Sequence, residues 1–373
     1  MTRLLQPFVL ALTALLAGGY VYVAARLGSG PWGRGVLAIP FVLVWIVPVI
    51  YWTGQREDAE TWLDKAAHQA SYLSMAWVSF ILVCTLARDL ALFVTAALPP
   101  SAAHEAVVRG GAPAVLVVSL LAMVIGVLTA LRGPRVEEVV VRVPGLHHDL
   151  EGFRIAQISD LHVGRNIRRT YVERVVERAN ALAPDFVALT GDMVDGPVER
   201  LAPEVAPLTE LATDGRAFFV LGNHDCYAGA HEWIAHFRSM GVRVLLNEHI
   251  VFRKGGATLV VGGVVDPAYR GARPEISLDD APNADFRLLL AHNPALAPLG
   301  ARAGFDLQLS GHTHAGQFFP WTLAVRLVHA PHVAGLSREG GMWVYVSAGT
   351  GTWGPPVRLG TSPEITLIKL APA

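Results

Sequence analysis

Charge is distributed unevenly along this sequence, and that distribution most limits what the chain can fold into. Residues 1–132 are nearly free of charged side chains, whereas residues 133–373 have the composition of an ordinary soluble domain. The first part contains four long apolar stretches, near Leu4–Ala25, Val36–Trp52, Ser71–Leu98 and Ala114–Leu131. About 20 helical residues, each rising ~1.5 Å, cross the ~30 Å hydrocarbon core of a bilayer. We therefore predict an all-α membrane domain of about four transmembrane helices over residues 1–132.

Two other interpretations of this region are less favourable. The first stretch could be a cleaved signal peptide, but its apolar run exceeds the usual core of about 7–15 residues, and three more stretches follow. The runs are apolar on every face, which favours a membrane over the buried core of a soluble domain. Aromatic residues gather near the ends of the stretches, as expected at membrane–water interfaces: Tyr20, Tyr22, Trp32, Tyr51, Trp52 and Trp62. The bilayer is therefore the first predicted partner.

Basic residues suggest an orientation for this multi-pass protein of the cell membrane. One side of the predicted membrane carries Arg3, Arg56, Lys65, Arg132, Arg135 and Arg142, and the other carries Arg26, Arg34 and Arg109. The positive-inside rule then places residues 133–373 in the cytoplasm. Arg88 and Asp89 either form an intramembrane pair or lie at the interface because the span ends near Ala87. Since adjacent residues do not face each other on a helix, we favour the interface.

After residue 132 the pattern changes to alternating strands and helices. Strands are expected over Val136–Val143, Phe153–Ser159, Asp185–Leu189, Arg216–Leu221, Val242–Leu246, Thr258–Val265, Phe286–Leu290 and Asp306–Leu309. Helical spacing covers Thr170–Leu182 and Ala230–Met240. The pattern predicts an α/β layered domain over residues 133–373. A net charge of −1 gives no basic face for nucleic acid, and two cysteines are too few for a disulfide framework.

Aspartate, histidine and asparagine gather where the predicted strands end. The segments are Asp160-Leu161-His162, Gly191-Asp192, Gly222-Asn223-His224-Asp225, His292-Asn293 and Gly311-His312-Thr313-His314. Sites in open α/β sheets form beyond the carboxyl ends of strands, so these segments are expected to converge. A set without thiolates suits divalent Mn, Fe, Zn or Ni and disfavours a structural cysteine–zinc site. Each segment alone could be a turn or a cap, but their joint occurrence indicates a metal site.

The order D-x-H, G-D, G-N-H-D, H and G-H-x-H resembles the calcineurin-like metallophosphoesterase superfamily, over roughly Val136–Leu370. Several segments are most similar to those of bacterial membrane-linked phosphodiesterase-like members. They are ISDLHVG, ALTGDMVDG, LGNHDCY and LQLSGHTHAGQFFP. The resemblance implies a layered β-sandwich flanked by helices and two divalent metal ions as cofactors. One ion would be held by Asp160, His162, Asp192 and His314. The other would be held by Asn223, His292, His312 and a bridging Asp192. The sequence departs from the pattern at Ala315, where relatives commonly have glycine.

The resemblance also implies how a phosphoric ester would be hydrolysed. A water between two ions ~3.5–4 Å apart would supply a bridging hydroxide that attacks phosphorus in line with the leaving alkoxide. His224 would protonate the leaving group, since histidine titrates near neutral pH. Asp225 would either orient His224 or make a structural hydrogen bond within its turn. Asn223, Arg165 and Arg168 are candidates for binding the substrate, although charged residues at a helix start are usually just solvated.

These features lead to one preferred function and two alternatives. The preferred function is a membrane-anchored binuclear-metal phosphoesterase that hydrolyses a phosphodiester or pyrophosphate bond in a lipid-linked substrate. The alternatives are a phosphomonoesterase or protein phosphatase acting on soluble substrates, and an inactive membrane scaffold. All ligand positions of the family pattern are present, which disfavours the scaffold. Specificity is expected in the loops Pro197–Pro207, Asp266–Ser277 and Phe318–Leu336, and Cys226 is interpreted as structural.

Overall fold

The computed structural model describes residues 7–53, 61–97, 99 and 102–373, and the chain forms two compact units. The first unit is helical and comprises the described residues up to Leu128 together with Gly354–Leu359. The second unit comprises Thr129–Trp353 and Gly360–Ala373. A short segment of the C-terminal part of the sequence thus packs with the N-terminal helices. The predicted domain boundary between residues 132 and 133 stays a prediction.

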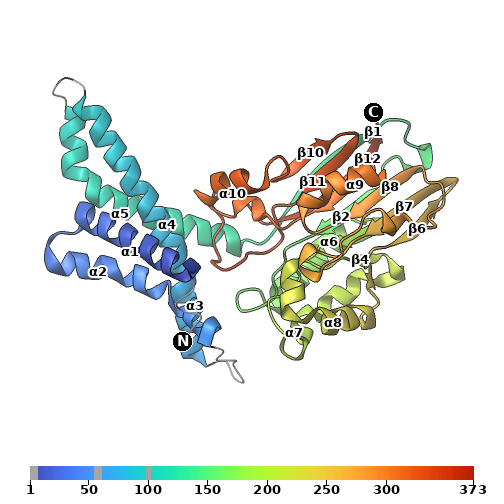
Figure 1. Cartoon of the computed structure of the whole chain (residues 1–373), viewed down its shortest axis with the longest axis horizontal. Coiled ribbons are helices and arrows are strands. Elements are labelled where there is room, and N and C mark those ends of the chain that lie inside the picture. Colours follow the sequence, from blue (N-terminus) through green and yellow to red (C-terminus); the bar gives the residue numbers. More distant parts are fainter. Residues whose placement is uncertain (1–6, 54–60, 98, 100–101) are drawn as a thin grey trace. The chain divides into compact units, whose positions relative to one another are not determined.

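The helical unit contains long apolar helices, drawn in blue to teal in Figure 1. They are α1 (Pro7–Leu27), α2 (Gly30–Leu43), α3 (Ile46–Thr53), α4 (Trp62–Ala96) and α5 (Ala102–Leu131). Among the described residues, four segments are long and apolar enough to cross a membrane: Val9–Leu27, Gly30–Val49, Trp62–Ala96 and Ala102–Leu131. The expected set of four apolar helices is confirmed. The predicted residues Arg3 and Arg56 and the side chains of Tyr51 and Trp52 lie outside the description.

The second apolar segment is broken between α2 and α3, and a side chain from α4 compensates for the break. Pro40 lies inside α2, where it removes one backbone donor from the helical ladder. The Ser71 hydroxyl donates a hydrogen bond of 3.0 Å to the Val44 carbonyl, and Ser71 Oγ accepts one of 3.3 Å from the Val47 amide. In lipid no water can satisfy such groups, so a hydroxyl from a neighbouring helix stabilises an interrupted span.

Helix α4 does not end near Ala87, since it continues to Ala96. Asp89, in its last turns, accepts a hydrogen bond of 2.9 Å from the Tyr22 hydroxyl and lies 2.8 Å from Arg26 Nε. Arg88 Nη1 also lies 3.3 Å from Asp89, so the two neighbours do interact although adjacent positions on a helix diverge. The carboxylate therefore joins α4 to the end of α1 rather than marking a helix terminus.

The second unit is built around two six-stranded sheets. The first has the order β1-β12-β2-β3-β4-β5, and the second has the order β10-β11-β9-β8-β7-β6. The first sheet consists of β1 (Arg135–Val143), β12 (Glu364–Pro372), β2 (Arg154–Ile158), β3 (Phe186–Leu189), β4 (Ala217–Phe219) and β5 (Arg243–Val244). The second consists of β10 (Gly335–Glu339), β11 (Met342–Val346), β9 (Leu307–Ser310), β8 (Phe286–Leu290), β7 (Ala257–Gly263) and β6 (Glu248–Lys254). The predicted layered α/β class is confirmed, and β6, β10, β11 and β12 are additions to the expected strands.

The core of this unit lies between the two sheets and under the helices that cover them. Phe153, Phe186 and Phe218 of the first sheet and its edges pack with Phe286 and Leu309 of the second, all fully or nearly fully buried. Such a side chain contributes about 1.5–3 kcal/mol on burial. The helices of this unit are α6 (Arg169–Ala181), α7 (Val198–Val205), α8 (Asn223–Ser239), α9 (Ala297–Ala303) and α10 (Trp321–His329). Two of the expected specificity loops therefore contain helices, namely α7 and α10.

Strand direction explains where the polar segments go. Strands β2, β3 and β4 are neighbours that run parallel, and so are β8 and β9 in the other sheet. Parallel strands end at one edge of a sheet, and ligand sites form beyond that edge. All five predicted segments directly follow one of these strands. The topology therefore brings them together from positions about 150 residues apart in the sequence.

Candidate metal centre

Two groups of three potential metal ligands lie side by side at this edge. The first consists of Asp160, His162 and His314, and the second of Asp192, His292 and His312, and within each group the ligand atoms lie within 4.8 Å of one another. In the first group His162 Nε2 is 3.0 Å from His314 Nε2, and His314 Nε2 is 3.4 Å from Asp160 Oδ1. All six side chains except that of His312 are buried.

Asp192 belongs to the second group and also faces the first. Its Oδ2 is 3.2 Å from His292 Nε2 and 3.8 Å from His162 Nε2, so a single oxygen faces a ligand of each group. Its other oxygen, Oδ1, accepts a hydrogen bond of 2.8 Å from the His224 backbone amide, which fixes the carboxylate. Asn223 completes the arrangement, because its Oδ1 lies 3.0 Å from His312 Nδ1. The structure thus brings together every side chain that the sequence predicts as a ligand.

The ligands are held by an unusual backbone. Asp160, His162, Asp192, His312 and His314 all have φ between +50° and +73°, in the left-handed region that non-glycine residues rarely adopt. Conformations of this kind cost about 1–3 kcal/mol each and concentrate at functional sites. Strain at five ligand positions indicates that the surrounding fold maintains this arrangement against its local cost.

Close approach explains one glycine of the motifs. A Cβ added to Gly222 would lie 2.2 Å from Asp192 Oδ1 and 2.4 Å from the Asp192 backbone nitrogen. Any side chain there would push the shared carboxylate out of place. At position 315 this chain has alanine where the family pattern uses glycine. Ala315 nevertheless has φ of 52°, in the left-handed region that favours glycine. The alanine is thus accommodated at a cost in strain, and the 3-10 turn His314–Gly316 that contains it still forms.

The electrostatics of the cluster are those of a cation site. Burial alone would lower the pKa of His162, but the negative charges of Asp195, Asp192 and Asp160 raise it to about 9. The pKa of His292 is also raised well above its ordinary value, because Asp192 and Asp160 outweigh burial. Burial itself raises the pKa of Asp160. Buried carboxylates therefore favour positive charge on the histidines between them, and metal ions replace protons at such sites.

The chemistry of the donors fits divalent metal ions. His292 Nε2 is buried without a hydrogen bond, and it points toward the Asp192 carboxylate. The other nitrogen of the ring, Nδ1, lies 2.8 Å from the Thr190 carbonyl, an arrangement that fixes the tautomer of a ligating histidine. Imidazole, carboxylate and amide oxygen are suitable ligands for first-row divalent ions. The residues present can therefore hold the metals that the sequence implies.

Asp195 is a residue of this site that the sequence interpretation missed. One of its oxygens, Oδ1, lies 2.9 Å from His162 Nδ1 and 2.8 Å from His224 Nδ1. Burial alone would raise the pKa of Asp195, but the facing His162 and His224 hold it well below its ordinary value. A single carboxylate thus orients both a metal ligand and the histidine beside the centre. The only signal in the sequence was its place in the quoted motif ALTGDMVDG.

Asp225 does not orient His224. Its two oxygens accept hydrogen bonds from the backbone amides of Asp192, Met193, Val194 and Gly222, at 2.8 to 3.1 Å. Burial and the charge of Asp192 raise the pKa of Asp225 to about 7. The side chain therefore ties the loop after β3 to the start of α8. Of the two roles expected for Asp225, the structure supports the structural hydrogen bonds, and the orienting contact belongs to Asp195.

The two arginines expected at the substrate differ in their surroundings. Arg168 lies 3.4 Å from Glu204, so its charge is engaged in an ion pair near the start of α6. Burial, together with the charges of Arg200 and Arg168, lowers the pKa of Arg165 to about 10. His224 itself is flanked by exposed aromatic rings, with Tyr227 and Trp353 each 5.8 Å from it between ring centroids. Binding of substrate by these arginines stays a prediction.

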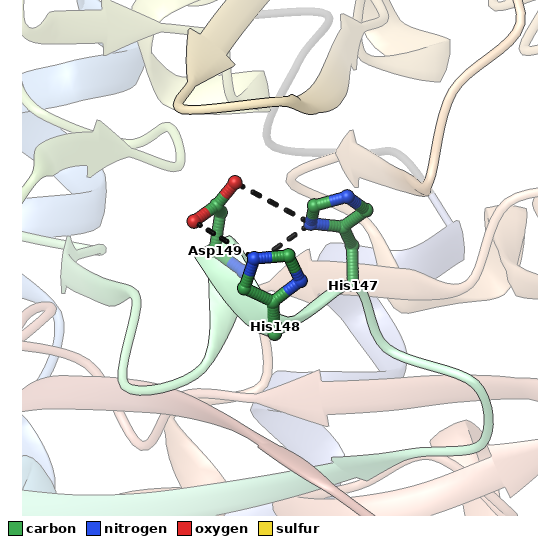
Figure 2. A group of neighbouring side chains, drawn as sticks. All are labelled: His147, His148 and Asp149. Carbon is green, nitrogen blue, oxygen red and sulfur yellow. Dashed lines mark hydrogen bonds and ion pairs between the residues drawn. The ribbon is translucent and has the colours of Figure 1, made fainter.

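A further group of potential ligands lies elsewhere in the sequence, in the turn after β1. Figure 2 shows the carboxylate of Asp149 facing the imidazole rings of His147 and His148. His147 Nδ1 accepts a hydrogen bond from the Asp149 amide, and Asp149 Oδ2 accepts one from the Gly256 amide. Because these atoms are occupied by backbone donors, the group closes two turns against each other.

Comparisons with known proteins agree with this geometry. The family model for calcineurin-like phosphoesterases matches residues 153–316. An uncharacterised metallophosphoesterase of Aquifex aeolicus is 32% identical over 63% of this chain and 91% of the relative. An uncharacterised metallophosphoesterase of Campylobacter jejuni is 26% identical over 99% of each chain.

A further relative, named as a transmembrane protein with metallophosphoesterase domain, comes from Danio rerio. It is 35% identical over 73% of this chain, and the chain spans about two thirds of its length, at 66%. Calcineurin-like phosphoesterases use divalent metals, and the four apolar helices agree with a membrane protein. The chain belongs to the calcineurin-like phosphoesterase family and is a metallophosphoesterase with a membrane-spanning region.

Proposed function

We propose that this protein is a membrane-anchored phosphoesterase that uses two metal ions to hydrolyse a phosphodiester or pyrophosphate bond in a lipid-linked substrate, with its catalytic unit in the cytoplasm. The observation that carries the proposal is the position of Asp192, whose Oδ2 faces histidines of both ligand groups. Two nearby cations repel each other, and a shared anionic ligand offsets that repulsion.

Bound divalent ions would neutralise charge on the phosphoryl oxygens and activate water for attack on phosphorus. Asp160, His162, Asp192 and His314 would hold one ion, and Asp192, Asn223, His292 and His312 the other. The remaining chemistry belongs to His224, which lies beside both groups without being needed as a ligand. Asp195 holds its Nδ1, so Nε2 is left to donate a proton to the departing oxygen.

The test is a comparison of substrates and variants in the full chain. The protein, reconstituted in nanodiscs and loaded with Mn, is assayed with bis-p-nitrophenyl phosphate and with p-nitrophenyl phosphate. Asp192→Asn and His224→Ala are compared with Asp214→Asn, a change of the same kind at an exposed turn. Metal content is measured in parallel by elemental analysis.

We expect the unaltered protein to cleave the diester and to hold two metals per chain. Asp192→Asn should lose both the cleavage activity and the metals, whereas Asp214→Asn should keep them. His224→Ala should keep its metals and lose activity by about 10²–10⁴-fold, the usual contribution of a general acid. A preference for the monoester would replace the diesterase proposal by the phosphatase alternative. Metal binding without turnover of either substrate would favour the scaffold.

A further inference from the structure

Helix α10 carries a dense group of exposed apolar side chains. Within the loop and helix formed by residues 319–329, Phe319, Trp321, Leu323, Leu327 and Val328 are exposed, and Leu327 and Val328 are 90% and 76% accessible. A solitary exposed leucine would mean little, but five large apolar side chains within ten residues form a patch of the kind that marks an interaction surface.

The last turn of the same helix lies beside the candidate metal centre. The ring of His329, in the last turn, lies 5.3 Å from the ring of the predicted ligand His312. The ligand loop is held from the far side as well, because the Thr313 hydroxyl donates a hydrogen bond of 2.6 Å to the Val333 carbonyl. Helix α10 therefore carries the exposed apolar patch next to the loop of the predicted ligands.

Two short stretches of chain connect this unit to the apolar helices. Helix α5 ends at Leu131 and β1 begins at Arg135, so the connection can extend at most about 14 Å. Gly354–Leu359 belongs to the helical unit, where the Arg358 amide donates a hydrogen bond of 2.9 Å to the Gly126 carbonyl of α5. This segment is the second place at which the chain connects the two units.

The residues that flank this segment are bonded to the loop that precedes α10. The Gln317 side chain exchanges two hydrogen bonds with the Trp353 backbone, at 2.8 and 2.9 Å, and the Thr361 hydroxyl donates to the Gln317 carbonyl. Gln317 is only four residues before Trp321, at which α10 starts. The loop before α10 is thus bonded to the residues at which the chain enters and leaves the segment Gly354–Leu359.

We propose that α10, together with Phe319, lies in the headgroup–acyl boundary of the bilayer that holds α1–α5, and so places the metal centre at the membrane surface. Leu323, Leu327 and Val328 would enter the boundary, and Trp321 has the amphipathic ring that is enriched at this depth. Arg326, exposed on the same helix, would meet lipid phosphates. The position of α10 is inferred independently of the proposed function. The substrate that this position would favour, an amphiphilic phosphoester, rests on the proposed function.

The first test measures the depth of α10 in the full chain, reconstituted at one chain per nanodisc of phosphatidylcholine and phosphatidylglycerol. Leu327→Cys is made in a Cys84→Ser, Cys226→Ser background and labelled with an environment-sensitive nitrobenzoxadiazole dye. Val251→Cys on β6, partly exposed like many surface positions, is the matched control. Helices of this kind lie about 5–10 Å deep, so brominated acyl chains should reduce emission at residue 327 about twofold and leave residue 251 unchanged.

Equal quenching at both positions would overturn the proposal. So would protection of residue 327 that develops only when two chains share a disc, because the partner would then be a second copy. The second test uses Leu327→Glu, a change of a 90% accessible side chain that should leave folding intact. Hydrolysis of bis-p-nitrophenyl phosphate should be unchanged, whereas hydrolysis of a long-chain alkyl p-nitrophenyl phosphodiester in the disc should fall about tenfold.

The two measurements separate the failure of each idea. If the unaltered protein hydrolyses neither probe, the proposed function is wrong, and quenching at residue 327 still decides where α10 lies. If both probes are hydrolysed and Leu327→Glu lowers neither rate, α10 does not present the metal centre to lipid, although the protein is an active phosphoesterase.

Discussion

Replacing Asp195 by asparagine tests how the centre is organised, because this change keeps the shape of the side chain and removes its charge. Asp195 Oδ1 accepts from His162 Nδ1 at 2.9 Å and from His224 Nδ1 at 2.8 Å. Hydrogen bonds to a charged group contribute about 1.5–3 kcal/mol, against about 0.5–1.5 kcal/mol for neutral ones. Two bonds weakened by about 1 kcal/mol each amount to about 2 kcal/mol, or about a 30-fold loss of kcat/KM.

The assay is diester hydrolysis by the Mn-loaded full chain, with Asp195→Asn, His224→Ala and the double variant measured together. If Asp195 acts through both histidines, its effect in the His224→Ala background should shrink to about fivefold, since only the bond to His162 remains to be weakened. A loss below about twofold in Asp195→Asn, or the same 30-fold loss with and without His224, would refute the shared role.

Four further outcomes are expected. His292→Ala should lower the metal content per chain while His236→Ala, on α8 and away from the ligand groups, should not; equal contents would remove His292 from the ligand set. Ala315→Gly should relieve left-handed backbone strain of about 1–2 kcal/mol. Because glycine also adds freedom to the unfolded chain, we expect a net gain of about 0.5–1 kcal/mol in the free energy of unfolding. A lowered melting temperature would argue against strain at this position. Burial raises the pKa of Cys226 to about 12, so at pH 8 its thiolate is scarce and alkylation by iodoacetamide should be slow until the protein unfolds; rapid native labelling would contradict this. Ser71→Ala should cost about 1–3 kcal/mol in the helical unit, measured by unfolding in mixed micelles, because it leaves the Val44 carbonyl unpaired; a neutral result would mean that another donor replaces Ser71.

Most of the buried apolar strands could be predicted from the sequence, but the buried strands β11 and β12 were missed together with the edge strands β6 and β10. Strands β6 and β10 carry charged and polar residues along an edge, which protects against edge-to-edge pairing and also hides the apolar run by which strands are recognised. The sequence places Phe318–Leu336 among the specificity loops because it carries no readable motif, whereas the structure forms helix α10 there. Its large apolar residues do not pack in the core but are exposed, which the sequence alone does not show.

The predicted metal ligands could be found in the sequence because their segments follow apolar strands, so the local sequence indicates both the residue types and their position. Asp195 could not, since its contacts with His162 and His224 join residues 33 and 29 positions apart and depend on how the loops meet. From the sequence, adjacency to His224 makes Asp225 a candidate for the orienting role, beside a structural hydrogen bond within its turn. Adjacent side chains in the first turn of α8 diverge, which is why Asp225 faces the loop after β3.

The place of β12 in the first sheet has a consequence for biosynthesis. This strand lies between β1 and β2, pairing with β1 in parallel and with β2 in the antiparallel sense. A ribosome makes Glu364–Pro372 only after every predicted metal ligand has been synthesised. Until then β2 has an unpaired edge toward β1, and such edges bind other chains. We therefore expect nascent chains that stop before Glu364 to engage chaperones or proteases even when their apolar helices are already inserted in the membrane.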